Sequence, residues 1–406
     1  MGTPSSSASA VPRCDAPPSL RRLALLLLLL STGCPAEPPP PLPVPPALAP
    51  LDDPTLAQAA DVLERLVEAR CLDPAEPWAL LHGVIARGAG LMIGGEAAPE
   101  PAVDRYVRDN LDRATLTFPA ARGGVKVEPH PGYFAKNALE LGVPPARPFP
   151  RPGGGEVTLA ALVLAQARAY APATQPVPFF DEAWRLELVA AAGERDAAQA
   201  ERARALRGPA LEALAENQAY LEPWLDDPAR PYDKPSQPGP DGRPRPAAIH
   251  RYVCGGFHFF QAVQRLHGAE LPPVLARQYR LLRLRLELEP RYWDEKLADA
   301  RARLPQERVR RHEAVILAQA LKVLGHGLET WLRAEAAGAL TLDPDDVAAA
   351  RRALDRLARV VLELDALGIF AGLDELRGRE PQLYLDLVGD GAHALHAVRL
   401  WQLRRT

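Results

Sequence analysis

Three histidines in the second half of the chain could share one chemical site. His258, His326 and His393 follow one another at intervals of 68 and 67 residues. Imidazole is a general acid or base near neutral pH and a common metal ligand in proteins. The near-constant interval suggests a repeated helical unit, in which equivalent helices would bring the three rings to one central cavity. We therefore take all three as candidate catalytic residues.

Cysteine and aspartate close to these histidines extend the possible chemistry to metal binding. His250, Cys254 and His258 lie four residues apart, so one continuous helix would place them on one face. Asp390 lies one helical turn before His393 and is a further candidate catalytic residue. Because zinc is bound by thiolate, imidazole and carboxylate groups, we take Cys254, His258 and His393 as candidate zinc ligands. The alternative is that each histidine is an ordinary core residue, bonded to a carbonyl or a buried carboxylate.

The sequence around two of the histidines is repeated. Residues 253–263 (VCGGFHFFQAV) and 388–398 (VGDGAHALHAV) share five of eleven positions, and both are rich in small residues. Glycine weakens a helix by ~1 kcal/mol relative to alanine, so its presence here favours helices that pack closely. A repeat of this length predicts helical hairpins, arranged as an α/α toroid or a solenoid.

Apolar residues recur at helical spacing through most of the chain, and no segment alternates with the period of a strand, so the predicted class is all-α. The segment 226–248 has seven prolines and is predicted to contain no regular element, whereas 124–127 could form a small strand. The expected helices cover residues 54–71, 76–87, 102–113, 132–141, 157–170, 180–193, 197–222, 249–267, 272–289, 291–303, 306–336, 344–367 and 381–403.

The first fifty residues have the composition of an export signal followed by a tether. Two arginines precede the apolar run 23–30, which is far shorter than the ~20 residues of a membrane span and has the length of a signal-peptide core. Ser31, Thr32, Gly33 and Cys34 follow, and nine of the sixteen residues in 35–50 are proline, which favours a stiff extended arm. The expected organisation is a signal peptide over 1–33, a tether over 34–51 and a helical domain over 52–406.

This leader resembles the bacterial lipoprotein signal, in which the cysteine after the cleavage point receives a diacylglycerol thioether. The resemblance implies palmitate-type lipidation of Cys34 and a place in the cell envelope, anchored to the membrane at the outer membrane or the periplasmic face. Ordinary cleavage near Gly33, leaving a soluble periplasmic protein, is the alternative.

The helical body looks like the α/α-toroid superfamily, in which protein prenyltransferases and lanthionine cyclases hold zinc with Cys, His and Asp. The paired Cys-His-Gly signature of the cyclases is absent here, so their activity is not carried over. The stretch Cys254-Gly255-Gly256-x-His258 also looks similar to a motif of uncharacterised bacterial envelope proteins, which implies no activity.

Composition narrows the choice of partners. The formal net charge of −3 gives no reason to expect a nucleic acid as a partner.

Cys71 and Cys254 could form a disulfide in an oxidising envelope or remain two separate thiols. Asp181, Trp184 and Glu187 could suit sugar binding or form a solvated helix face.

Two functions remain open at this point. The domain could present a central cleft to an envelope ligand or protein, as a binding or scaffolding module. It could instead be an enzyme acting on a glycan, peptide or isoprenoid, with the cleft histidines as acid–base groups or as ligands of zinc.

Overall fold

The computed structural model describes residues 40–44, 47–94, 98–171, 179, 182–239 and 241–404. The predicted signal peptide and the proposed lipidation site Cys34 lie outside these residues. None of the described helices is long and apolar enough to cross a membrane.

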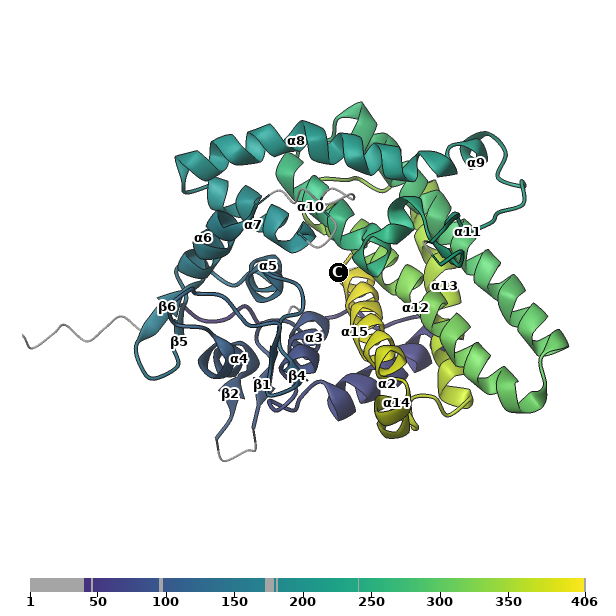
Figure 1. Ribbon diagram of the computed structural model, residues 1–406, viewed down its shortest axis with the longest axis horizontal. Coiled ribbons are helices and arrows are strands. Elements are labelled where there is room, and N and C mark those ends of the chain that lie inside the picture. Colours follow the sequence, from purple (N-terminus) through teal and green to yellow (C-terminus); the bar gives the residue numbers. More distant parts are fainter. Residues whose placement is uncertain are drawn as a thin grey trace, which may run out of the picture. The chain divides into compact units, whose positions relative to one another are not determined.

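The prediction of an all-α protein is confirmed (Figure 1). Strands occur in the described residues only as four short antiparallel pairs. The helices are α2 (Pro54–Arg70), α3 (Pro77–Arg87), α4 (Ala102–Asn110), α5 (Tyr133–Glu140), α6 (Leu159–Ala169), α7 (Ala183–Gly193), α8 (Ala197–Gln218), α9 (Pro223–Asp226), α10 (Phe257–His267), α11 (Pro273–Arg303), α12 (Gln306–Ala336), α13 (Pro344–Ala366), α14 (Leu373–Arg379) and α15 (Pro381–Leu403). The strand pairs are β1 (Met92–Ile93) with β2 (Glu100–Pro101), β3 (Ala121–Arg122) with β4 (Val125–Lys126), β5 (Pro148–Pro150) with β6 (Glu156–Thr158), and β7 (Ser236–Pro238) with β8 (Pro244–Pro246).

Local sequence signals explain where several helices begin. Asp53 accepts hydrogen bonds from the backbone N–H groups of Thr55 and Leu56 at 2.9 and 3.1 Å, so it caps α2 ahead of Pro54. Asp343 caps α13 in the same way, as part of a reciprocal capping box.

Three of the predicted segments differ most from the structure. Helices were expected over 272–289 and 291–303, but α11 runs through Pro290 without a break. The two residues that precede Pro290 are Leu288 and Glu289, and both are buried. Tertiary packing therefore outweighs the helix-breaking preference of proline. The segment 226–248 contains the hairpin of β7 and β8, although no regular element was predicted there.

The third difference lies beside the candidate site. A single helix was expected over 249–267, but α10 begins only at Phe257. Two 3₁₀ turns, Ala248–Arg251 and Val253–Gly256, precede it. The repeat partner of the second turn, residues 388–391, lies inside the continuous helix α15. The five shared residues therefore do not mark one repeated backbone conformation.

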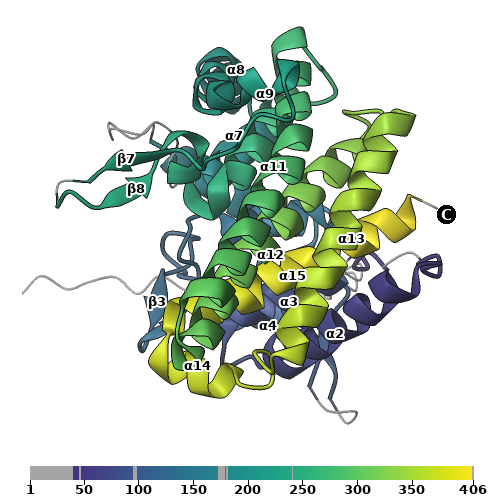
Figure 2. The same ribbon diagram turned by 90° about the vertical axis from the view of Figure 1, so that its right-hand side faces the viewer.

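The longest helices of the second half pack around α12. Helices α11 and α12 form a helical hairpin joined by Leu304 and Pro305, and α12 also packs against α13, α10 and, most extensively, α15 (Figures 1 and 2). The approach of α12 to α15 depends on Gly325. A Cβ atom there would lie 3.1 Å from the Asp390 carbonyl oxygen and 3.1 Å from the Ala394 nitrogen.

Part of the proline-rich segment lies on the helical domain. Leu42 and Leu51 pack against the hydrophobic core, and the Gln402 side chain donates a hydrogen bond to the Ala49 carbonyl at 2.8 Å. The chain from Pro41 onward therefore belongs to one compact unit with the helices.

Candidate functional site

The structure brings the three candidate histidines together from three different helices. His258 lies on α10, His326 on α12 and His393 on α15. The ring centres are 5.0 Å apart for His258 and His326, 5.4 Å for His258 and His393, and 4.0 Å for His326 and His393. All three side chains are buried in the core.

Each histidine uses one ring nitrogen for a hydrogen bond to a neighbouring side chain. His326 Nε2 donates to Asp390 Oδ1 at 3.1 Å, and His393 Nδ1 donates to Glu329 Oε2 at 2.7 Å. His258 Nδ1 donates to the Gln261 side-chain oxygen at 3.1 Å. When a ring is neutral, such a bond fixes its tautomer and leaves the second nitrogen as a lone-pair donor.

Two of these second nitrogens have no hydrogen-bond partner among the described residues. They are Nδ1 of His326 and Nε2 of His393, and both are buried. A buried polar atom without a partner is unfavourable by ~1–3 kcal/mol, so native structures rarely keep one without a reason.

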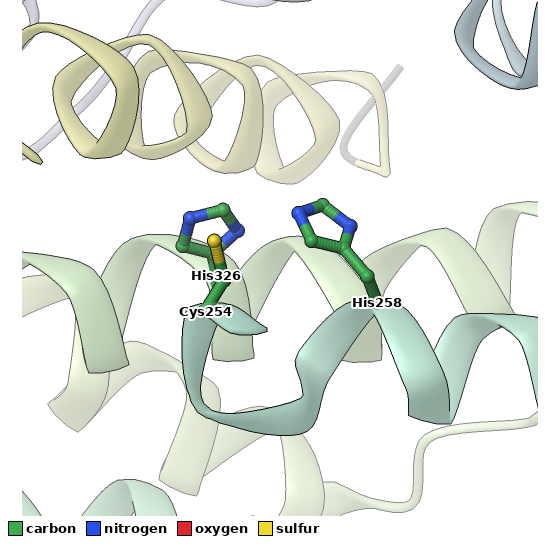
Figure 3. Close-up of side chains that lie close together, drawn as sticks. All are labelled: Cys254, His258 and His326. Atoms are coloured by element: carbon green, nitrogen blue, oxygen red, sulfur yellow. The ribbon is translucent and has the colours of Figure 1, made fainter. Parts of the chain in front are cut away.

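Cys254 completes the cluster from an unusual backbone position. Its φ angle is 47°, and Gly255 and Gly256 follow with φ angles of 64° and 80°. A cysteine in the left-handed region is strained, and such strain concentrates at functional sites. In Figure 3 the Cys254 sulfur is drawn over the His326 ring and the His258 ring lies to one side; a ligand atom of each residue lies within 4.8 Å of the other two.

Arg285 holds the cysteine turn in place. Its guanidinium donates to the Gly255 carbonyl at 2.7 Å and lies 4.3 Å from the centre of the Phe257 ring. The same guanidinium is paired with Glu289, and both side chains are almost fully buried. The turn is therefore fixed by a rigid buried ion pair.

The donor atoms of this cluster fit a metal ion. Ligand atoms of Cys254, His258 and His326 lie within 4.8 Å of one another, and those of His326, Glu329 and His393 form a second such group. A histidine ring centre lies about 3 Å from a zinc ion that the ring binds, so two tetrahedral ligands have centres about 5 Å apart. The observed 5.0 and 5.4 Å agree with this spacing, whereas the 4.0 Å between His326 and His393 is shorter, so these two rings would have to move apart to bind one ion.

Carboxylates surround the histidines in the manner of an outer ligand shell. Glu329 accepts hydrogen bonds from His393 and from His396, each at 2.7 Å. Burial alone would raise the pKa of Glu329, but these two histidines hold that pKa well below its usual range. Asp390 lies 3.8 Å from Lys322, which also pairs with Asp386 at 3.1 Å.

Burial and neighbouring charges shift the pKa values of the three histidines in different directions. Burial lowers the pKa of His258 and of His393 well below the usual value, which keeps them neutral and able to bind a metal. Burial also opposes protonation of His326, but Cys254 and Asp390 raise its pKa to about 10. A metal ion bound here would have to displace that proton.

Sequence reasoning misplaced one residue and missed another. His250 was expected on one helical face with Cys254 and His258, but it accepts a hydrogen bond from the Tyr220 hydroxyl at 2.8 Å and lies beside Glu289. The reason is that the chain forms separate 3₁₀ turns there. Glu329 was not predicted, although it follows His326 by three residues and therefore lies on the same face of α12.

The two described cysteines are separate free thiols, so Cys71 and Cys254 form no disulfide. Cys71 is fully buried, and burial raises its pKa to about 12.

A pocket of about 490 Å³ lies next to the histidine cluster. Helices α5, α7, α10, α12 and α15 all contribute side chains to it, and the three central histidines do not line it. Gln261 and His396 line the pocket and also hydrogen bond to the cluster, through His258 and Glu329 respectively. Two residues of the pocket wall, Gln261 and His396, therefore each make a hydrogen bond to a residue of the cluster.

Comparison with known proteins gives no assignment for this site. No family model, no curated protein and no solved structure matches the chain.

Proposed function

We propose that the helical domain is a metal-binding domain with a zinc centre built by Cys254, His258, His326 and His393. The observation that carries the proposal is the pairing of each imidazole with Gln261, Asp390 or Glu329 through one nitrogen, which leaves the other nitrogen available as a ligand. Hydrogen-bond partners of this kind orient and strengthen histidine ligands in zinc proteins.

The donor set favours zinc over other ions. One thiolate and three imidazoles suit a tetrahedral zinc ion, whereas magnesium and calcium prefer oxygen ligands. The strained turn at Cys254 supports the same choice, since it directs a sulfur toward the imidazoles.

The proposed location is the cell envelope. The lipoprotein-like leader supports a chain that is anchored to the membrane by lipid on Cys34 and that presents its helical domain to an envelope ligand or protein. Mass spectrometry of the native product tests this location directly. A mature N-terminus that begins with an acylated Cys34 is expected, and an uncut leader or an unmodified Cys34 thiol would refute it.

Enzymatic activity is the second candidate function, and one observation favours it. The chain of hydrogen bonds from His393 through Glu329 to His396 links the centre to the adjacent pocket. If only three of the four proposed ligands bind the metal, the remaining position is open to water or a substrate, as in catalytic zinc sites. Cobalt substitution tests this alternative, because added azide changes the visible spectrum only of an open site.

Metal analysis of the purified full chain tests the main proposal. About one zinc ion per folded chain is expected after zinc loading and desalting. Cys254→Ala and His258→Ala should each lower zinc affinity at least ~10-fold. His312→Ala is the matched control, since His312 lies on the exposed side of α12 and hydrogen bonds to the Arg308 carbonyl. Stoichiometric zinc in both cluster variants at unchanged affinity, with normal helical circular dichroism, would refute the centre.

A further inference from the structure

The pocket beside the histidine cluster contains a buried acid that lacks a hydrogen-bond donor. Glu187 on α7 is only 5% exposed, and its Oε1 atom has no hydrogen-bond partner among the described residues. The expectation of a solvated helix face around Trp184 and Glu187 is therefore wrong, because both side chains are buried. Asp181, the third residue of that set, lies outside the described residues.

The nearest cation does not satisfy Glu187. Lys136 Nζ lies 3.9 Å from Glu187 Oε1, beyond hydrogen-bonding distance. The same ammonium group is 2.7 Å from Glu140 and 3.0 Å from the Gln261 side-chain oxygen, so its donors are directed elsewhere. Glu187 is thus a buried acceptor on the pocket wall that a donor group of a ligand could reach.

Positive charge lines the same pocket. Arg333 is paired with Glu140, while Arg265 is about half exposed and pairs with Glu194 at 2.9 Å. Of the two arginines, Arg265 is the one whose guanidinium a solvent-borne anion can approach. The rest of the wall has a small or apolar part, with Leu139, Gly268, Ala269, Ala334, Ala336, Ala337, Ala339 and Leu400, and a polar part, with Gln261, Gln264, Tyr279, Thr330 and His396.

We infer that this pocket binds a small zwitterion of the amino-acid or short-peptide class, with its ammonium group at Glu187 and its carboxylate at Arg265. The volume of about 490 Å³ lies within the ~300–1,000 Å³ of small-molecule sites. Alanine-rich walls fit short aliphatic side chains. The inference goes beyond the zinc centre and does not require it, since neither Glu187 nor Arg265 belongs to the proposed ligand set.

Titration calorimetry on the full chain with trialanine, and with alanine as the smaller probe, tests the inference. N-acetylated trialanine and trialanine amide each lack one of the two terminal charges, so each is expected to bind about tenfold more weakly than trialanine. The ratio of alanine to trialanine affinity then distinguishes a free amino acid from a peptide.

Two variants locate the contacts. Glu187→Gln should abolish the preference for a free amino terminus, and Arg265→Gln should abolish the preference for a free carboxylate. Arg195→Gln is the control, because Arg195 lines a neighbouring pocket and not this one. Because Arg265 is half exposed, the Arg265→Gln variant should fold even if the Glu187→Gln variant, which changes a buried side chain, fails to fold.

The measurement should be repeated after chelation. Binding that survives chelation supports a site independent of the metal, whatever the outcome of the zinc analysis. Failure of all probes to bind, or equal binding of the blocked and free peptides, would overturn the inference and leave the zinc proposal unaffected.

Discussion

Replacing Gly325 by alanine tests whether close contact between α12 and α15 builds the histidine cluster. The new Cβ would lie 3.1 Å from two backbone atoms of α15, those of Asp390 and Ala394, and neither atom belongs to a flexible side chain. The helices would have to separate by a few tenths of an ångström. That shift would move His326 away from Asp390 and His393, which lie on α15.

The expected change in stability has two opposing parts. Overpacking of a dense core is unfavourable by ~1–3 kcal/mol, while replacing a helical glycine by alanine is favourable by ~1 kcal/mol. The net loss in the free energy of unfolding should be about 0–2 kcal/mol, so the fall in zinc affinity is the more decisive of the two measurements. Zinc affinity should fall about tenfold, because the donors are displaced while every ligand is retained.

The assays are urea unfolding and competition for zinc with a chromophoric chelator. Gly378→Ala is the control, since Gly378 lies in α14 and an added Cβ there meets no atom within 4 Å. The control should be neutral or gain up to ~1 kcal/mol with unchanged zinc affinity. If Gly325→Ala behaved like this control in both assays, the close contact between the two helices would not be what positions the site.

Three further predictions concern other parts of the same core. Arg285→Lys should weaken zinc binding about tenfold with all ligands present, because the guanidinium that holds the cysteine turn is lost, whereas Arg283→Lys at the surface of the same helix should not. Burial raises the pKa of Glu128 to about 8, so its contribution to stability is complete below about pH 4.5 and is lost as the pH rises through 8. Unfolding free energies should therefore decline across that range by on the order of 5 kcal/mol. Glu128→Gln should flatten this slope, and its persistence in the variant would contradict the assignment. In residue-resolved alkylation, Cys254 should become reactive on chelation and Cys71 only on unfolding, so early labelling of Cys71 or chelator-independent labelling of Cys254 would count against the proposed centre.

The sequence was sufficient for the helices but not for the turn that carries Cys254. Apolar periodicity and the caps at Asp53 and Asp343 predicted most helix positions, because these signals are local. The spacing of His250, Cys254 and His258 also looked helical, yet the chain adopts two 3₁₀ turns there. Three successive left-handed residues are possible because two of them are glycines, and they persist because Arg285, distant in sequence, binds their backbone. Local patterns contain no information about that contact.

The meeting of the histidines could be anticipated only in part. Small residues around His326 and His393 indicated helices in close contact, and Gly325 confirms that reason. The repeated sequence, in contrast, has only a partial counterpart in the backbone, since 253–256 form a turn whereas 388–391 lie within a helix. His258 and His393 themselves are both helical. The partners Glu329 and Gln261 depend on which faces of α10, α12 and α15 meet, and tertiary packing decides that.

His82 is an ordinary core histidine of the same chain, with which the histidines of the cluster can be compared. His82 is equally buried, and both its ring nitrogens are satisfied, Nδ1 by the Trp78 carbonyl at 2.7 Å and Nε2 by the Tyr133 hydroxyl at 2.8 Å. Its pKa is lowered by burial to about 4, so it is a neutral core residue with no capacity left for a ligand.

His326 and His393 differ from His82 at one nitrogen each. Each ring has one carboxylate partner and one buried nitrogen without a hydrogen-bond partner. His326 also lies close to Cys254 in its strained turn. Two such nitrogens would together be unfavourable by ~2–6 kcal/mol if packing were their only role. A core under selection for stability alone would satisfy them as it satisfies His82, or would replace the rings by apolar side chains. Binding of a metal cation accounts for both nitrogens, for the two carboxylates behind them and for the strain at Cys254 with one assumption.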